Sequence, residues 1–266
     1  MFTLAYKKSI ILPPTFDETQ PFKIIALEDN TPIIFVYGPQ SFSIKNNKNE
    51  TFTAALSESV TLEKAGDWIE ITGYPAITDF LSSPVGICLK INKDVKFEGN
   101  ILSLNNFEYH IAQYWKFMWD NVNITNLPHL SHISHFEEHT FMNAFEGTGI
   151  TEIDENVFAN TIYCSHDSFK YMFKDCKSLT KAILPNIIVE DSYSNTGALN
   201  NMFNGCSNLS YIKVGFKSCN AIYNSELIST NWVNGVAKNG TFVCPEELEQ
   251  IFDSSHIPPN WTVETY

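Results

Sequence analysis

The chain has 266 residues, 44% of them hydrophobic, so it is long enough for one large or two ordinary globular domains. Thirty acidic residues against seventeen basic ones give a formal charge of −13, which disfavours nucleic acid as a partner because phosphate backbones are repelled. No apolar run approaches the length of about 18 residues that a membrane span needs, so we expect no membrane insertion. The apolar run at 10–12 ends at Pro13 and is too short for a signal-peptide core, which predicts synthesis in a cytoplasm.

The first part of the chain divides into an arm and a β-rich segment. Residues 1–21 show no sustained period, and we expect an N-terminal arm or linker there. From 22 to 104, short apolar runs alternate with turn residues, at intervals of roughly ten residues. The predicted strands are 22–27, 33–37, 41–45, 51–56, 60–62, 68–72, 85–91 and 95–97. Many short strands of this kind favour an antiparallel β-sandwich over 22–104.

A repeat occupies the second half of the chain. Residues 172–180 read Met-Phe-Lys-Asp-Cys-Lys-Ser-Leu-Thr, and residues 202–209 read Met-Phe-Asn-Gly-Cys-Ser-Asn-Leu. Weaker copies precede them, and a degenerate copy follows at 231–236, where Val236 takes the cysteine position. The aromatic anchors are spaced by 26, 28 and 30 residues: Trp119, Phe145, Phe173 and Phe203. Self-similarity at such a period indicates a repeat architecture.

Each repeat is predicted to contain a short helical turn with the aromatic anchor, a tight turn and one strand. The strands are expected at 124–127, 150–153, 179–184 and 209–214. One such unit cannot cover its own apolar side, whereas stacked neighbours can, so we expect a right-handed solenoid with a parallel ladder of strands over 105–239. The segment 240–266 departs from the repeat and is interpreted as a C-terminal cap. The predicted class is therefore α+β, mostly β.

The outward strand positions are the candidate binding face. In a strand with one buried side, alternate residues face solvent, and stacking brings the equivalent positions of successive repeats together. The positions selected in this way are Thr180, Lys181, Ser210, Tyr211 and Lys213. Because an exposed aromatic ring can stack on a sugar or anchor a protein interface, Tyr211 is the strongest candidate among them.

Histidines form the only cluster that suggests a metal. His129, His132 and His135 follow one another at intervals of three, with His139 and two glutamates close by. Imidazoles at such spacing can hold zinc or iron. However, the spacing crosses a predicted strand exit and a turn, so the rings need not converge. Solvated turn histidines are the favoured interpretation and a metal site is the alternative; we expect no cofactor.

Neither the cysteines nor the carboxylates indicate catalysis. The six cysteines contain no Cys-x-x-Cys pair, which disfavours disulfides, and Cys176 and Cys206 share one repeat position, as expected for small buried side chains. The neighbouring acids at 154–155 and 246–247 are interpreted as residues at helix starts. The sequence has no glycine-rich phosphate loop, nucleophile elbow or zinc-protease motif, so we expect no enzyme.

The repeats and several further segments resemble a known family. Besides 172–180 and 202–209, the segments that carry the resemblance are 26–29, 65–67, 95–101, 127–128, 184–185, 240–242 and 257–263. Over about 22–266 the chain resembles the BspA-like leucine-rich repeat proteins of gut Bacteroidetes and their phages. This resemblance implies a leucine-rich-repeat solenoid that serves adhesion or recognition through its surface, without enzymatic activity.

The resemblance also implies a location and partners. Cellular members of the family usually carry a secretion or lipoprotein signal, and residues 1–14 show none. This favours a phage virion protein, made in the host cytoplasm and exposed on a tail or another appendage, with residues 1–21 as its attachment. Its partners would be other virion proteins, a host-surface glycan or a host-surface protein. A bacterial cell-surface or secreted adhesin and a purely structural virion decoration protein are the alternatives, and homo-oligomerisation stays open.

Overall fold

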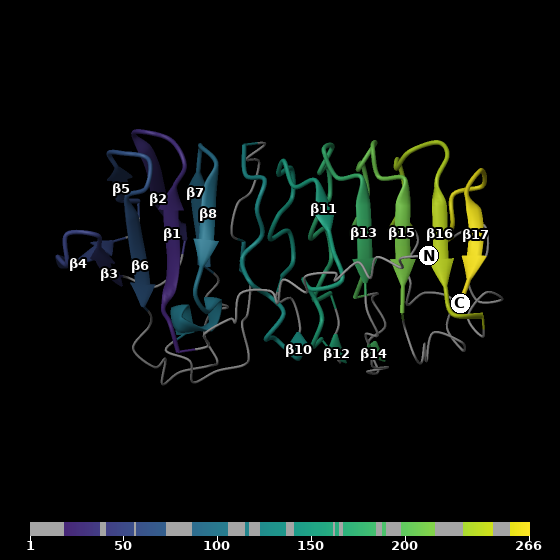
Figure 1. Ribbon diagram of the computed structural model, residues 1–266, viewed down its shortest axis with the longest axis horizontal. Helices are drawn as coiled ribbons and strands as arrows, with labels where there is room; N and C mark the ends of the chain where they lie inside the picture. Colours follow the sequence, from purple (N-terminus) through teal and green to yellow (C-terminus); the bar gives the residue numbers. More distant parts are fainter. Residues whose placement is uncertain are drawn as a thin grey trace, which may run out of the picture.

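The strands of the protein form one elongated row, with two sheets at one end and stacked coils of chain towards the other (Figure 1). This arrangement is seen in a computed structural model. The structure describes residues 19–37, 41–55, 57–72, 87–105, 115–116, 123–136, 141–161, 163–164, 167–184, 188–189, 198–215, 231–246 and 256–266. Most of the expected N-terminal arm and the anchor Trp119 lie outside these residues.

The N-terminal part consists of two sheets. All eight strands expected there are present, and their ends differ from the expected ones by at most two residues. They are β1 (Phe22–Ala26), β2 (Thr31–Tyr37), β3 (Ser41–Asn46), β4 (Thr51–Ala55), β5 (Ser59–Leu62), β6 (Trp68–Thr72), β7 (Ile87–Ile91) and β8 (Val95–Glu98). One sheet has the order β4-β3-β6-β1-β8, and the other has the order β5-β2-β7-β9, in which β9 (Trp115–Lys116) runs parallel to β7.

The two N-terminal sheets share one core. The ring of Phe35 on β2 lies 5.0 Å from that of Phe42 on β3, so an apolar side chain from each sheet meets its counterpart from the other. A short 3-10 helix, η1 (Ile101–Asn105), joins strands that are distant in sequence, because the hydroxyl of Ser103 accepts from the N–H of Phe22 at 2.7 Å and donates to the carbonyl of Ile71 at 3.2 Å. The result is sandwich-like, with few unpaired polar groups inside.

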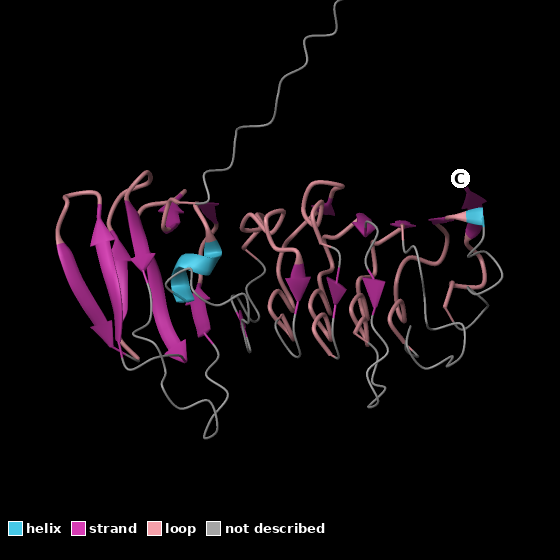
Figure 2. Ribbon diagram, turned by 90° about the horizontal axis from the view of Figure 1, so that it is seen from below, coloured by secondary structure: helices cyan, strands magenta, loops and turns pink. Residues whose placement is uncertain are grey.

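The coils that follow build two parallel sheets (Figures 1 and 2). The longer sheet contains β11 (Glu152–Ile153), β13 (Lys181–Leu184), β15 (Tyr211–Val214), β16 (Thr241–Cys244) and β17 (Thr262–Thr265). The shorter sheet contains β10 (His135–Phe136), β12 (Tyr163–Cys164) and β14 (Ile188–Val189). Each strand pairs in parallel with the equivalent strand of the next coil, as in the register of Lys181 with Tyr211.

The expected helix-plus-strand repeat, and with it the leucine-rich-repeat solenoid, is wrong. The described part of the chain contains no α-helix, and the segments expected to be helical are ribbons of turns. In the ribbon, alternate N–H groups donate to carbonyls of the next coil. Phe173 donates to the carbonyl of Met202 at 3.1 Å, and Asp175 donates to that of Asn204 at 2.8 Å. The N–H of Lys174, between them, bonds to Tyr171 three residues back. An α-helix would direct each of these donors four residues back.

Left-handed residues at every fourth position explain this conformation. Positive φ angles recur in each coil, at Asn143 and Gly147, Tyr171 and Asp175, Asn201 and Gly205, and Asn231 and Gly235. An L-residue with positive φ ends a right-handed helix, and glycine and asparagine adopt this conformation at the lowest energetic cost. The helical prediction was wrong because it was based on the aromatic and cysteine positions, which have a helix-like spacing. The backbone conformation is instead set by the positions with positive φ, most of which are asparagine or glycine.

A column of aromatic rings fills the interior of the stack. Phe145 lies 5.6 Å from Phe173, which lies 6.1 Å from Phe203, and both pairs are nearly parallel. In the degenerate copy Trp232 continues the column at 5.9 Å from Phe203. All of these side chains are buried. Because each ring packs mainly on the rings of the coils before and after it, the repeated aromatic position supplies one layer of core per coil.

One further expectation about the stack is corrected, and the segment interpreted as a C-terminal cap contains strands of the long sheet. Residues 124–127 form no strand; the N–H and hydroxyl of Thr125 instead donate to the carboxylate of Asp94, at 3.0 and 2.7 Å, which joins the first coil to the N-terminal sheets. The segment 240–266 contributes β16 and β17, so it extends the ladder, and Thr241 follows its partner Tyr211 by 30 residues, the same step as between Lys181 and Tyr211.

Candidate binding face

The alternation of buried and outward residues positions the predicted face. On β13 and β15 the inward side chains are buried, while Lys181, Tyr211 and Lys213 are partly exposed on the other side of the sheet. Parallel pairing sets Lys181 beside Tyr211, and Ile183 beside Lys213. The outward strand face is defined by the residues at the outward positions of five strands, of which Val243 is buried: Glu152, Lys181, Ile183, Tyr211, Lys213, Thr241, Val243, Thr262 and Glu264.

The other two predicted residues lie at the edge of this face. Thr180 and Ser210 are exposed and immediately precede β13 and β15. Their backbones continue the ladder, because Ser210 donates its N–H to the carbonyl of Thr180 at 3.0 Å, and Thr180 donates to that of Thr151 at 2.9 Å. The hydroxyl of Thr180 also donates to Thr151. The structure therefore brings three of the five predicted residues onto the face and the other two to its margin.

Tyr266 is a component of the face that sequence reasoning missed. Its ring lies 4.4 Å from the ammonium of Lys213, and its hydroxyl donates to the carbonyl of Val214 at 3.1 Å. The residue is 59% exposed. A cation over an aromatic ring is attracted by the π-electrons, so Tyr266 and Lys213 hold each other in place. Only the register of β17 brings this residue over β15, and no motif in the sequence encodes that register.

The charges of the face are mixed. The ammonium of Lys181 lies 4.0 Å from the carboxylate of Glu152, and both side chains are more than one third exposed. Such a pair contributes little to stability in water, so Lys181 stays available to a ligand. In a chain with a net charge of −13, Lys181 and Lys213 give this sheet a local supply of cationic donors.

The histidines are only partly described. Burial, together with a smaller electrostatic contribution from the neighbouring His129, lowers the pKa of His132 to about 4, so His132 is neutral at physiological pH. The backbone of His135 forms part of β10, while its side chain and all of His139 lie outside the described residues. Among the described side chains no group of three metal-ligating residues occurs. The metal site stays a prediction.

The cysteines that share a repeat position are interior groups. Cys176 and Cys206 are buried, and their thiols donate to the carbonyls of Phe145 and Phe173 at 3.1 and 3.0 Å. In the preceding coil Thr148 occupies this position, and its hydroxyl donates to the carbonyl of Phe145 in its own coil at 2.8 Å, the same carbonyl to which the Cys176 thiol donates. Burial raises the pKa of the Cys176 thiol to about 11, which keeps it protonated and unreactive near neutral pH. The four described cysteines are free thiols.

Comparisons with known proteins leave the resemblance untested. Nothing matches the chain among family models, curated proteins or solved structures. In the described residues, no helix combines the length and the apolar character that crossing a membrane requires.

Proposed function

We propose that the chain is a non-enzymatic binding protein that holds a host-surface glycan or protein on its outward strand face. The observation that carries this proposal is the parallel register, which collects Tyr211, Lys213 and Tyr266 on one side of a single sheet. Aromatic rings stack on the apolar faces of sugars, and ammonium and hydroxyl groups bond to sugar hydroxyls and to peptide carbonyls.

The shape of the face supports a long ligand over a small molecule. Neighbouring strands lie about 4.8 Å apart. Lys181, Tyr211 and Thr241 occupy equivalent positions on three paired strands, so polar side chains recur along the face at the spacing of the strands. A ligand with its own regular spacing, such as a polysaccharide or an extended peptide, can bond to several coils in succession. Each contact is weak, and the affinity comes from their number.

The proposal also includes the location of the chain, which is a phage virion. We propose that the chain belongs to the tail or another exposed appendage of a phage, because its repeats resemble surface repeats found in gut Bacteroidetes and their phages. The expected N-terminal arm would join the chain to neighbouring virion proteins. Absence of the protein from purified particles would overturn this part of the proposal, and the binding role of the face would then belong to a cell-surface adhesin.

The face is tested by binding of the full chain to a glycan array and to intact host cells. We expect Tyr211→Ala to weaken binding by about tenfold, as for the loss of a central aromatic contact. Thr53→Ala, on the exposed edge strand β4, is the matched control and should bind like the unaltered chain. Equal binding by Tyr211→Ala and the unaltered chain would show that the ligand lies elsewhere.

A further inference from the structure

The turn ribbons bond to one another by a fixed rule. In each described interior coil, N–H groups two residues apart donate to carbonyls two residues apart in the next coil. Phe173 and Asp175 donate to Met202 and Asn204, and Phe203 and Gly205 donate to Trp232 and Asn234, at 2.8 to 3.1 Å. The residue between each pair of accepting carbonyls carries an apolar side chain, Phe203 in one coil and Val233 in the next.

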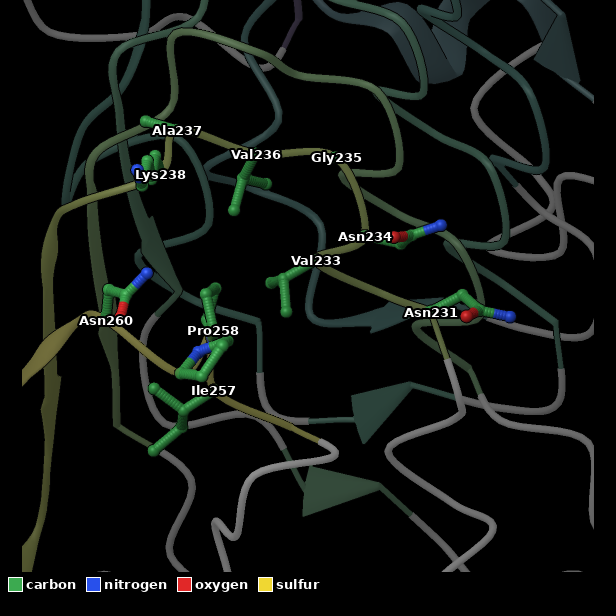
Figure 3. A pocket seen from close by; sticks show the side chains of 11 residues that line it. Asn231, Val233, Asn234, Gly235, Val236, Ala237, Lys238, Ile257, Pro258 and Asn260 are labelled. Atoms are coloured by element: carbon green, nitrogen blue, oxygen red, sulfur yellow. The ribbon is translucent and has the colours of Figure 1, made fainter.

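Among the described residues, no further turn ribbon follows the one at 231–235. By the same rule the N–H groups of Val233 and Gly235 face the position of a following coil, and neither has a hydrogen-bond acceptor among the described residues. Both residues line a pocket of about 360 Å³ (Figure 3). We call it the end pocket; its lining is Asn231, Val233, Asn234, Gly235, Val236, Ala237, Lys238, Ile257, Pro258, Pro259 and Asn260.

A shortened final coil accounts for the pocket. Tyr211 and its partner Thr241 are 30 residues apart, whereas Thr241 and its partner Thr262 are only 21 apart. The sheet therefore gains one more strand, β17, from a coil that is nine residues shorter than the one before it (30 − 21). Ile257 and Pro258 cover one side of the exposed ribbon, and Figure 3 shows them across the pocket from Val233 and Val236.

We infer that the end pocket docks a short segment of a partner protein, which supplies the missing turn. The segment must present two backbone carbonyls two residues apart, to accept from Val233 and Gly235, with an apolar side chain between them. The partly buried Val236 and the walls formed by Ile257 and Pro258 suit that side chain. A backbone donor left without an acceptor under a bound partner is costly, so the two N–H groups select for such acceptors.

Two other occupants fit less well. A second copy that docks symmetrically would bring its own Val233 and Gly235 donors to face the same donors, so no bonds could form. A single carboxylate supplies one accepting group, whereas the two donors belong to residues two positions apart and are matched in the other coils by two separate carbonyls. The docked segment is thus peptide backbone, and the end pocket is a separate surface from the outward strand face.

The probe is a capped peptide with the chain's own turn sequence, residues 200–205, Asn-Asn-Met-Phe-Asn-Gly. It is titrated into the isotope-labelled full chain and followed by amide NMR. We expect saturable shifts of the Val233 and Gly235 amides at millimolar peptide. The same peptide with Phe203→Asp should produce no saturable shift, because the apolar side chain between the carbonyls is lost.

Variants of the full chain assign the binding to the end pocket. Val236→Arg places a long charged side chain in the pocket and should abolish the shifts, while Thr241→Arg on the outward strand face should not. If Val236→Arg does not fold, Pro258→Arg on the opposite wall makes the same test.

The inference is overturned if the peptide causes no saturable shift, if sodium acetate causes the same shifts, or if binding persists in the folded pocket variants. Tyr211→Ala should leave the titration unchanged, so failure here is distinct from failure of the proposed glycan or protein binding by the outward face.

Discussion

The two halves of the molecule differ in which strands pair with one another. In the N-terminal sheets most strands pair with strands that do not follow them directly in the chain: β1 pairs with β6 and β8, and β2 pairs with β5 and β7, while β3 and β4 form a hairpin. In the stack every strand of the long sheet pairs with the strand of the next coil. The first half therefore folds as one cooperative unit, whereas the second is close to a sum of nearest-neighbour contacts.

The two halves also differ in where residues with positive φ lie along the backbone. In the N-terminal sheets the left-handed residues Asn30, Asn49 and Gly66 lie in connections between strands, where a single turn needs them. In the stack such residues recur inside each coil and set the conformation of the ribbon. Strain in the first half is thus local to a turn, while in the second half it is repeated with the period of the fold.

The largest expected effect comes from removing one ring from each core. Phe173→Ala and Phe35→Ala should each lower the free energy of unfolding by about 3 to 5 kcal/mol, because both rings are fully buried. Hydrogen exchange should separate the halves. Phe173→Ala is expected to speed exchange in its own and the adjoining coils, and Phe35→Ala throughout both N-terminal sheets. Uniformly faster exchange in Phe173→Ala would contradict nearest-neighbour behaviour.

A pair of glycines tests close packing against backbone strain. A Cβ on Gly240 would lie 2.5 Å from the carbonyl oxygen of Ser210 and 2.6 Å from the ring of Trp261, so Gly240→Ala should cost about 2 to 3 kcal/mol. Gly66 has φ +92° but open space around the Cβ position, and Gly66→Ala should cost about 1 kcal/mol. Chemical denaturation measures both. Equal losses would show that the coils are not packed as tightly as the structure indicates.

The pH dependence probes the start of the stack. The folded pKa of His132, about 4, lies below its ordinary value of 6.5, so the unfolded chain takes up this proton first as the pH falls. The contribution is fully present above pH 6.5 and is lost progressively between 6.5 and about 4. Because the ring is partly exposed, we expect a loss of about 1 to 2 kcal/mol. His132→Gln should flatten the curve of unfolding free energy in this window.

The smallest expected effect is a gain in stability. Asp175 has φ 59°, where the equivalent residue of the other coils is Gly147, Gly205 or Gly235. Asp175→Gly should raise the free energy of unfolding by about 0.5 kcal/mol, since glycine adopts this conformation without strain. Asp175→Ala is the control and should lower it, because alanine tolerates positive φ less well than aspartate. A gain in both variants would attribute the effect to the lost charge.

How far the sequence alone predicts this molecule depends on the length of its patterns. The eight N-terminal strands were predicted because each is four to seven residues long and is bounded by turn residues. The short sheet of β10, β12 and β14 was not, because two residues carry no readable alternation. The outward positions of β13 and β15 followed from alternation plus the repeat. Tyr266 could not be found, because its place depends on a register set by tertiary contacts.

The turn ribbons were predicted wrongly, as short helical turns. Phe173, Cys176 and Leu179 have a spacing of three, which is typical of one face of a helix. The structure uses that spacing for turns, and the signal lies in Asn201 and Gly205, whose four-residue interval recurs at Asn231 and Gly235. Attention to residues that favour positive φ would have indicated turns at these positions.

Because all turn ribbons share one geometry, the stack can be lengthened by duplication of a repeat. Each described interior coil accepts hydrogen bonds from the coil before it and donates hydrogen bonds to the coil after it, so a duplicated unit of 30 residues would find partners on both sides. Every added unit would extend the molecule by about 4.8 Å and add one more outward row to the sheet. Reach and ligand length could thus be altered by duplication, with no change to the N-terminal sheets or to the end pocket.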